Sequence, residues 1–170
     1  MKNFGWEKYF VWLKHFFCPE FNRKSAIRMA VIAAVSVIFF LIFRPCFIMG
    51  SSMEPGYSDH GVVLSFTLRY TFVPVKRGDV VTVSYFGKRY LLKRVVALAG
   101  DVVEFRSGKL LVNGKEQEEP YVKNPCRWTT SPVKVEEGFC FIVGDNRDQP
   151  QIEHIHGQVS LDRITGGPLW

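Results

Sequence analysis

The sequence has no internal repeat, no low-complexity linker and, from Pro45 onward, little of the apolar spacing that marks helices. Cysteine is scarce, with four residues, and no cysteines or histidines form the two well-spaced ligand pairs of a zinc site. Of the net charge of +6, four units lie in residues 1–28, and the rest of the chain predicts no basic face of the kind that nucleic-acid binding needs on a folded domain. The sequence therefore predicts no metal, no cofactor and no nucleic-acid partner.

An uncharged apolar run of 15 residues, Met29 to Phe43, lies between Arg28 and Arg44. As a helix it is about 22 Å long, less than the roughly 30 Å hydrocarbon core of a bilayer. The flanking long side chains can reach the interface, which extends the predicted span to residues 25–44. A buried core helix and a cleaved signal peptide are the alternatives. The run shows no polar face, however, and no small-x-small cleavage site follows it.

The charge distribution predicts an orientation for this single signal-anchor. Residues 1–28 carry six Lys or Arg and two Glu side chains, and little positive charge follows the span directly. By the positive-inside rule, residues 1–24 are cytoplasmic and residues 45–170 form an extracytoplasmic domain at the cell membrane. The first seventeen residues, rich in Phe, Trp and Tyr, suit an interfacial helix on membrane lipid or a flexible tail. Outside the cytoplasm a Cys126–Cys140 disulfide is permitted, and the sequence leaves it open.

The part after Pro45 predicts a mainly β domain. Short β-branched or aromatic runs recur between Gly, Asp, Asn and Pro, and the Ser107-Gly108 and Asn113-Gly114 pairs favour tight hairpins. The predicted strands are Val62–Phe66, Val80–Tyr85, Tyr90–Ala97, Val102–Phe105, Lys109–Val112 and Phe139–Val143. Short strands at this spacing favour a coiled antiparallel sheet or barrel-like domain behind one transmembrane helix.

Ser52 is the candidate nucleophile. Gly50 permits backbone conformations that other residues resist, and Pro55 stiffens the turn that follows. Such a turn can direct the Ser52 hydroxyl and the Ser52 backbone N–H toward one point, where the N–H would serve in an oxyanion hole. Ser51 is a weaker rival, and an ordinary loop serine is the alternative interpretation.

Lys93 is the candidate general base. In an alternating strand it shares a face with Leu91 and Val95, and burial among apolar side chains favours the neutral amine. Arg94 would point to the opposite face. Lys88 is the nearest competitor, and a solvated strand lysine is the alternative interpretation.

Four motifs occur in order behind the predicted anchor and resemble those of type I signal peptidases, the Ser/Lys serine proteases of the S26 class. They are Ser52-Met53-Glu54-Pro55, Arg77-Gly78-Asp79-Val80-Val81, Leu92-Lys93-Arg94-Val95-Val96-Ala97-Leu98-Ala99-Gly100-Asp101 and Gly144-Asp145-Asn146-Arg147-Asp148. The resemblance extends from about Arg44 to Gly157. It implies a membrane-bound endopeptidase that removes signal peptides from exported preproteins after small residues, in Ala-x-Ala patterns.

The resemblance also implies roles for single residues. Ser52 would be the acylating nucleophile, and Lys93 would be the general base and later the acid. Some relatives add a hydroxyl two residues before the nucleophile, where this chain has Gly50. The remaining matched positions would support the site structurally: Asp79, Asp145, Asn146 and Arg147.

The last motif departs from the family pattern. Pro150 stands in place of a serine near the lysine amine, Ile152 in place of an aspartate and His154 in place of an arginine. Glu153 with His154 could replace the acid–base brace, and a metal site at His154 and His156 is a weak alternative. The departure leaves two other hypotheses open: a dedicated maturation protease for few clients, and a weakly active scaffold relative.

Overall fold

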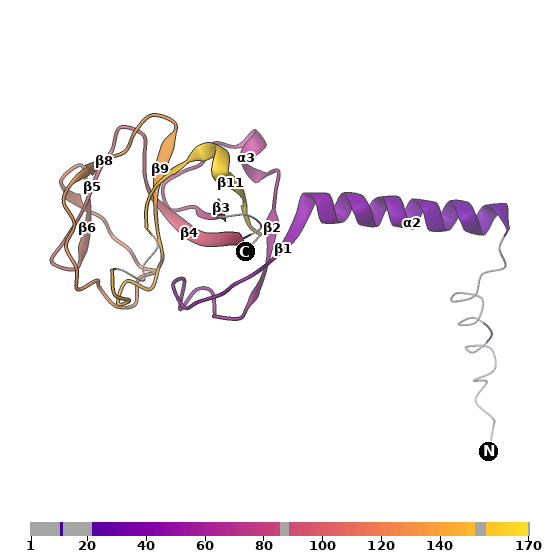
Figure 1. The fold of residues 1–170 in the computed structure, drawn as a ribbon, viewed down its shortest axis with the longest axis horizontal. Helices are drawn as coiled ribbons and strands as arrows, with labels where there is room; N and C mark the ends of the chain where they lie inside the picture. Colours follow the sequence, from indigo (N-terminus) through magenta and orange to yellow (C-terminus); the bar gives the residue numbers. More distant parts are fainter. Residues whose placement is uncertain (1–10, 12–21, 86–88, 152–155, 170) are drawn as a thin grey trace, which may run out of the picture. The chain divides into compact units, whose positions relative to one another are not determined.

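The computed structural model describes residues 11, 22–85, 89–151 and 156–169, and the chain divides into two compact units, residues 1–41 and 42–170. In the first unit the main described element is helix α2 (Arg23–Ile42), labelled in Figure 1. Asn22 caps it: the Ser25 backbone N–H donates to Asn22 Oδ1 at 2.9 Å, and the Asn22 N–H donates to Ser25 Oγ at 3.1 Å. This reciprocal pair satisfies amides that have no partner inside the helix.

Helix α2 lies two residues earlier than the predicted span of 25–44. It ends at Ile42 because Phe43 already pairs with Phe66 in a β-ladder, and Pro45 cannot continue a helix. Within the described residues, α2 is the one helix long and apolar enough to cross a membrane, judged by length and composition. Apart from Val11, the predicted interfacial segment over residues 1–17 lies outside the described residues, as does Cys18.

The second unit is built on antiparallel sheets, which confirms the predicted mainly β fold. The seven-stranded sheet has the order β1-β2-β11-β3-β4-β9-β10. Its strands are β1 (Phe43–Phe47), β2 (Val62–Phe66), β11 (Ile164–Pro168), β3 (Val80–Tyr85), β4 (Arg89–Leu98), β9 (Phe139–Val143) and β10 (Gly157–Ser160). Two short helical elements flank it, α3 (Arg69–Phe72) and the 3-10 turn η1 (Leu161–Arg163).

A four-stranded sheet of order β7-β6-β5-β8 completes the domain. Its strands are β7 (Lys115–Glu116), β6 (Lys109–Val112), β5 (Val102–Arg106) and β8 (Val133–Lys134). The predicted turn at Ser107-Gly108 connects β5 to β6, and both residues have positive φ, as a tight hairpin turn requires. All six predicted strands are present, and only β4 and β5 extend beyond their predicted ends.

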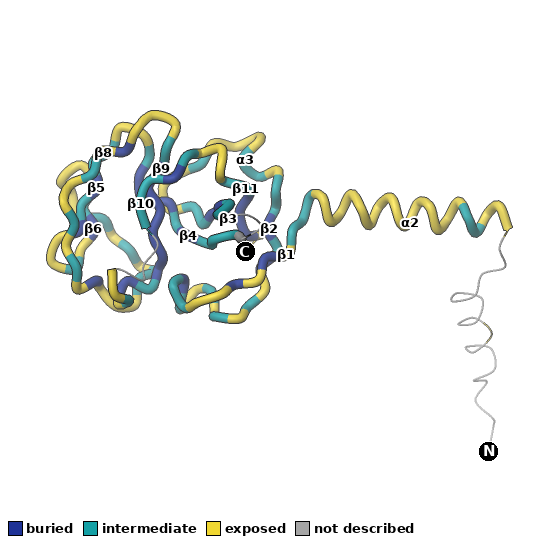
Figure 2. The backbone as a smooth tube through the Cα atoms, viewed as in Figure 1, coloured by how far each residue is buried: buried dark blue, intermediate teal, exposed yellow. Residues whose placement is uncertain are grey.

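Strand β9 separates two apolar cores, and for that reason its five residues form an unbroken hydrophobic run. Phe141 and Val143 belong to a core shared with the four-stranded sheet, while Cys140 and Ile142 belong to a core beside β3 and β10. Figure 2 shows this buried strand between more exposed turns. Cys126 lies in the first core and Cys140 in the second, and both are free thiols, so the permitted disulfide is not formed.

Candidate active site

Ser52 lies in a turn that follows β1, where the chain is held from two sides. Gly50 has φ +95°, a conformation that favours glycine, and its N–H donates to Asp59 Oδ1 at 2.7 Å. Asn146 holds Ser51 and Ser52: its backbone N–H donates to the Ser52 carbonyl at 3.0 Å, and its Nδ2 donates to the Ser51 carbonyl at 3.1 Å. Asn146 therefore sets the backbone from which the Ser52 hydroxyl projects.

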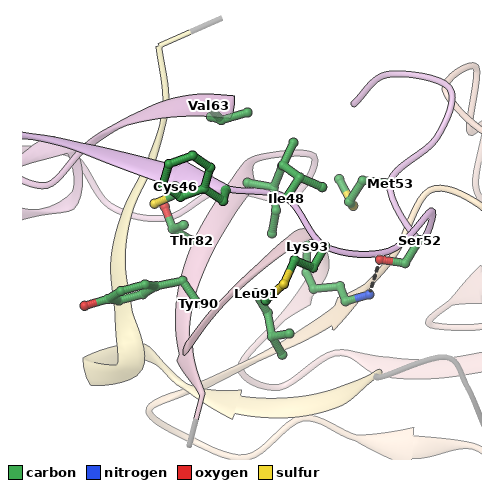
Figure 3. A pocket seen from close by; sticks show the side chains of 12 residues that line it. Cys46, Ile48, Ser52, Met53, Val63, Thr82, Tyr90, Leu91 and Lys93 are labelled. Atoms are coloured by element: carbon green, nitrogen blue, oxygen red, sulfur yellow. Dashed lines mark hydrogen bonds between the residues drawn. The ribbon is translucent and has the colours of Figure 1, made fainter. Parts of the chain in front are cut away.

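Lys93 lies in the middle of β4, paired with Val81 of β3, and only 3% of its surface is exposed. Its Nζ donates to Ser52 Oγ at 2.8 Å, the dashed contact in Figure 3. Within the described residues Ser52 is the one recorded hydrogen-bond partner of this amine. The fold thus brings together two side chains separated by 41 positions in the sequence.

The neighbouring serine has a different partner. Gln149 Nε2 donates to Ser51 Oγ at 2.6 Å, so the structure assigns the lysine contact to Ser52 and leaves Ser51 away from it. The other rival of the sequence analysis, Lys88, lies outside the described residues.

Burial lowers the pKa of Lys93 from its ordinary 10.5 to about 8, and the negative charge of Asp145 opposes part of this shift. A charged amine loses hydration energy in an apolar cavity, so the neutral form is favoured. An amine that titrates near pH 8 can accept a proton from a serine hydroxyl at physiological pH.

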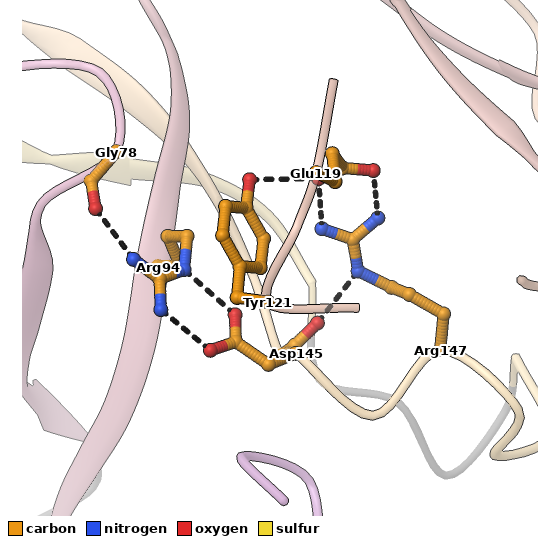
Figure 4. Close-up of polar contacts among 7 residues, drawn as sticks. Gly78, Arg94, Glu119, Tyr121, Asp145 and Arg147 are labelled. Atoms are coloured by element: carbon orange, nitrogen blue, oxygen red, sulfur yellow. Dashed lines mark hydrogen bonds and ion pairs between the residues drawn. The ribbon is translucent and has the colours of Figure 1, made fainter. Parts of the chain in front are cut away.

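Arg94, the next residue of β4, is saturated with oxygen partners (Figure 4). Its Nε and Nη2 donate to the two carboxylate oxygens of Asp145 at 2.8 and 2.7 Å, and its Nη1 donates to the Gly78 carbonyl at 2.7 Å. The guanidinium also stacks on the Tyr121 ring, 3.8 Å from its centre. This fork-to-fork pair joins β4 to the turn that carries Asn146.

Arg147 forms a second buried ion pair in the same region, also drawn in Figure 4. Its two terminal nitrogens donate to Glu119 at 2.9 and 2.5 Å, and its Nε donates to the Gly144 carbonyl at 2.7 Å. The Tyr121 hydroxyl donates to Glu119 at 2.9 Å and so connects this pair with Arg94.

Asp79 lies apart from these contacts. It accepts the Lys76 backbone N–H at 2.9 Å, and its carboxylate is 3.7 Å from Arg69 Nη2. Its backbone carbonyl accepts the Val95 N–H at 2.8 Å, so Asp79 braces the turn that leads into β3 against β4.

The departing last motif is only partly described. Pro150 is exposed and His156 stacks on Trp128, whereas Ile152, Glu153 and His154 lie outside the described residues. Among the described residues no group of three or more His, Cys, Asp or Glu side chains is arranged to hold a metal.

A small cavity of about 40 Å³ opens beside the Ser52–Lys93 contact. Figure 3 shows Ile48, Met53 and Leu91 among the mostly apolar side chains around it. Clefts that take drug-sized ligands measure roughly 300–1,000 Å³. The cavity therefore admits only small apolar groups next to the serine.

The sequence analysis missed Glu119, Tyr121 and Gln149. Glu119 stands next to the exposed Glu118 in a loop after β7, and no local pattern distinguishes the two carboxylates. Only the fold shows that one of them meets Arg147 while its neighbour faces solvent.

Comparisons with known proteins place the chain in a family. The family model for signal peptidase, peptidase S26, matches residues 22–168. Signal peptidase I of Bacillus licheniformis is 34% identical over 141 residues, covering 76% of this chain and 75% of that protein. Signal peptidase I T of Bacillus subtilis (strain 168) is 32% identical over 155 residues, covering 84% and 79%.

Among solved structures, a crystal structure of a signal peptidase I from Enterococcus faecalis V583 covers 56% of this chain and 97% of that chain, at 24% identity and a TM-score of 0.43. The family and sequence matches define the chain as a serine peptidase, a class of hydrolases. Within that class it belongs to the signal peptidase family, peptidase S26.

Proposed function

We propose that this protein is a membrane-bound endopeptidase that removes N-terminal signal peptides from exported preproteins, with Ser52 as nucleophile and Lys93 as general base. The observation that carries the proposal is the 2.8 Å contact between Ser52 Oγ and a buried Lys93 Nζ. Family membership supports the substrate class, because the relatives compared are signal peptidases.

The geometry supports the following reaction. Neutral Lys93 accepts the hydroxyl proton as Ser52 Oγ attacks the scissile carbonyl, and the same amine then gives that proton to the leaving amine. The peptide bond breaks and an ester to Ser52 remains. Lys93 next takes a proton from water, whose oxygen attacks the ester carbonyl, and it then gives this proton to Ser52 Oγ as the ester bond breaks. The signal peptide leaves with a free carboxyl group, and the serine hydroxyl and neutral amine are regenerated.

The Ser52 backbone N–H is the proposed oxyanion donor. No acceptor for it is recorded among the described residues, so it is available to the oxygen that becomes negative in the tetrahedral intermediate. One such donor contributes roughly 3–4 kcal/mol to the transition state. Gly50 carries no hydroxyl that could add a second donor from its side chain.

Cleavage after small residues is proposed from the size of the cavity. About 40 Å³ of space beside the dyad, bounded by Met53, Ile48 and Leu91, suits an alanine methyl group and excludes long side chains. Enlarging the cavity by Met53→Ala should therefore allow valine or leucine before the cleaved bond, measured with peptides that differ only at that position. Unchanged selectivity would contradict this origin of the specificity.

The membrane arrangement is part of the same proposal. Residues 1–24 would be cytoplasmic, the predicted span of 25–44, which contains most of α2, would cross the membrane lipid, and residues 45–170 would lie outside. The apolar composition of α2 and the basic N-terminal residues support it. Protease added to spheroplasts should digest the domain after Pro45, and protection of that domain would reverse the orientation.

The test of the reaction is cleavage of an Ala-x-Ala preprotein by detergent-solubilised protein. Ser52→Ala should reduce kcat by about 10⁴-fold or more, because it removes the nucleophile. Ser51→Ala is the matched control, since its hydroxyl contacts Gln149, and it should keep activity within about tenfold. Cleavage by Ser52→Ala at the wild-type rate would reject the proposed nucleophile.

A further inference from the structure

Glu119 belongs to a loop between β7 and β8, yet its side chain is 90% buried against Arg147, itself only 2% exposed. The pair is held at both ends: Tyr121 donates to Glu119, and Arg147 donates to the Gly144 carbonyl at 2.7 Å. Desolvating two charges is costly and is tolerated where the hydrogen bonds are nearly complete. The Glu119–Arg147 pair therefore fixes the loop after β7 relative to the turn after β9.

Gly144 connects this pair to the reacting atoms. A side-chain carbon added at Gly144 would run into the Ser52 carbonyl and would come within 3.2 Å of Lys93 Nζ. The backbone at Gly144 therefore forms a wall directly against both members of the dyad. Any shift of Arg147 moves the carbonyl that it holds, and with it this wall.

The same wall lies against the lysine amine, whose residue is only 3% exposed. The charged or titratable groups around Lys93 are Asp145 on the neighbouring turn, with Cys46 of β1 and Tyr90 of β4 in the shared cavity. Burial is the largest influence on the amine, so an opened wall would rehydrate it.

We propose that Glu119 is a positioning residue for the reaction: it holds Arg147, which holds Gly144 against Ser52 and Lys93. The inference rests on the proposed roles of these two residues. It assigns a function to a single carboxylate of the loop after β7, which touches neither substrate nor dyad and acts through Arg147 and Gly144.

The test is Glu119→Gln, which keeps the shape of the side chain and removes its charge. We expect kcat to fall by about 10- to 100-fold with little change in KM, as for a small misplacement of reacting groups. The pH midpoint of kcat should move upward, because water admitted at Gly144 favours the charged amine. A role in stability alone would move neither kcat nor this midpoint in the folded protein.

Two controls isolate the effect. Glu104→Gln removes the same charge from a pair with Arg106, whose side chain is 62% exposed, and Glu118→Gln removes the exposed neighbouring carboxylate. Both should keep wild-type kcat and the wild-type pH midpoint. Glu119→Asp, which restores the charge on a shorter side chain, should recover part of kcat.

If Glu119→Gln does not fold, Glu119→Leu combined with Arg147→Met removes both charges and leaves no unpaired buried guanidinium. This double variant should fold and still show the reduced kcat and the raised pH midpoint. Wild-type values of both in either folded variant would overturn the positioning role. Ser52→Ala measured in parallel separates this outcome from failure of the proposed dyad, which would appear as cleavage without the serine.

Discussion

Lys93 and Arg94 are adjacent basic residues on β4, and their surroundings shift their pKa values in opposite directions. Lys93 faces an apolar cavity and donates to the Ser52 hydroxyl, and burial lowers its pKa to about 8. Arg94 is partly buried, but its hydrogen bonds to Asp145 and the charge of Asp145 outweigh the desolvation, and its pKa is raised.

The difference teaches that burial alone does not decide whether a cation can act as a base. The guanidinium of Arg94 stays charged and, paired with a carboxylate, holds strands together, whereas a buried lysine without such a pair gives up its proton more easily. The experiments below exchange or remove the features that distinguish the two sides of β4.

The largest expected effect follows Lys93→Met, which makes the cavity side of β4 wholly apolar. Without a base, kcat should fall by about 10⁴-fold in the preprotein cleavage assay. The fold should become more stable at pH 7, by about 3 kcal/mol, because a buried charge is removed. Urea unfolding curves of wild type and variant would measure this gain.

The stability difference between Lys93→Met and wild type should depend on pH. The folded pKa of Lys93 is depressed, so the unfolded chain binds the extra proton between pH 8 and 10.5. Wild-type stability should therefore rise across this window and approach that of Lys93→Met. A constant difference from pH 7 to pH 10 would show that Lys93 is not desolvated.

On the side of β4 that carries Arg94, the variant Asp145→Asn leaves the guanidinium without its carboxylate partner. The free energy of unfolding should fall by about 3 kcal/mol, because the remaining charge is buried and uncompensated. Asp145 also raises the pKa of Lys93, so its loss should move the pH midpoint of kcat to below 8. A midpoint shifted to higher pH would contradict the assigned influence of Asp145.

The wild-type enzyme itself should show the titration of Lys93. Only the neutral amine accepts a proton, so kcat should rise about tenfold for each pH unit up to about 8 and then level off. Steady-state rates from pH 5 to 10 would measure it, with Ser51→Ala as a variant that keeps the same midpoint. A flat profile, with chemistry shown to be rate-limiting, would argue against a lysine base.

The smallest effect is expected from Tyr121→Phe. This change removes the hydrogen bond to Glu119 and keeps the ring against Arg94. The free energy of unfolding should fall by about 1 kcal/mol with kcat nearly unchanged. A loss of kcat above tenfold would show that the Tyr121 hydroxyl does more for the site than its one hydrogen bond to Glu119 explains.

Two strands that the sequence failed to predict, β1 and β11, lack the usual strand pattern for identifiable reasons. Strand β1 contains Pro45, which is tolerated because β1 lies at a sheet edge. Strand β11 contains Gly166, where a side-chain carbon would lie 2.5 Å from the Phe66 carbonyl, so close backbone approach requires glycine. Both reasons depend on neighbours that are distant in the chain.

The sequence by itself determined the apolar helix, six strands and the family, because hydropathy, alternation and motifs are properties of contiguous residues. It also singled out Ser52 and Lys93, although the distance between their side chains was beyond its reach. Tertiary structure decided that Ser52 and not Ser51 meets the lysine, that Cys126 and Cys140 stay apart, and that Glu119 holds Arg147 across 28 positions. Such contacts depend on how sheets pack, and no local pattern encodes the burial that gives each charge its pKa.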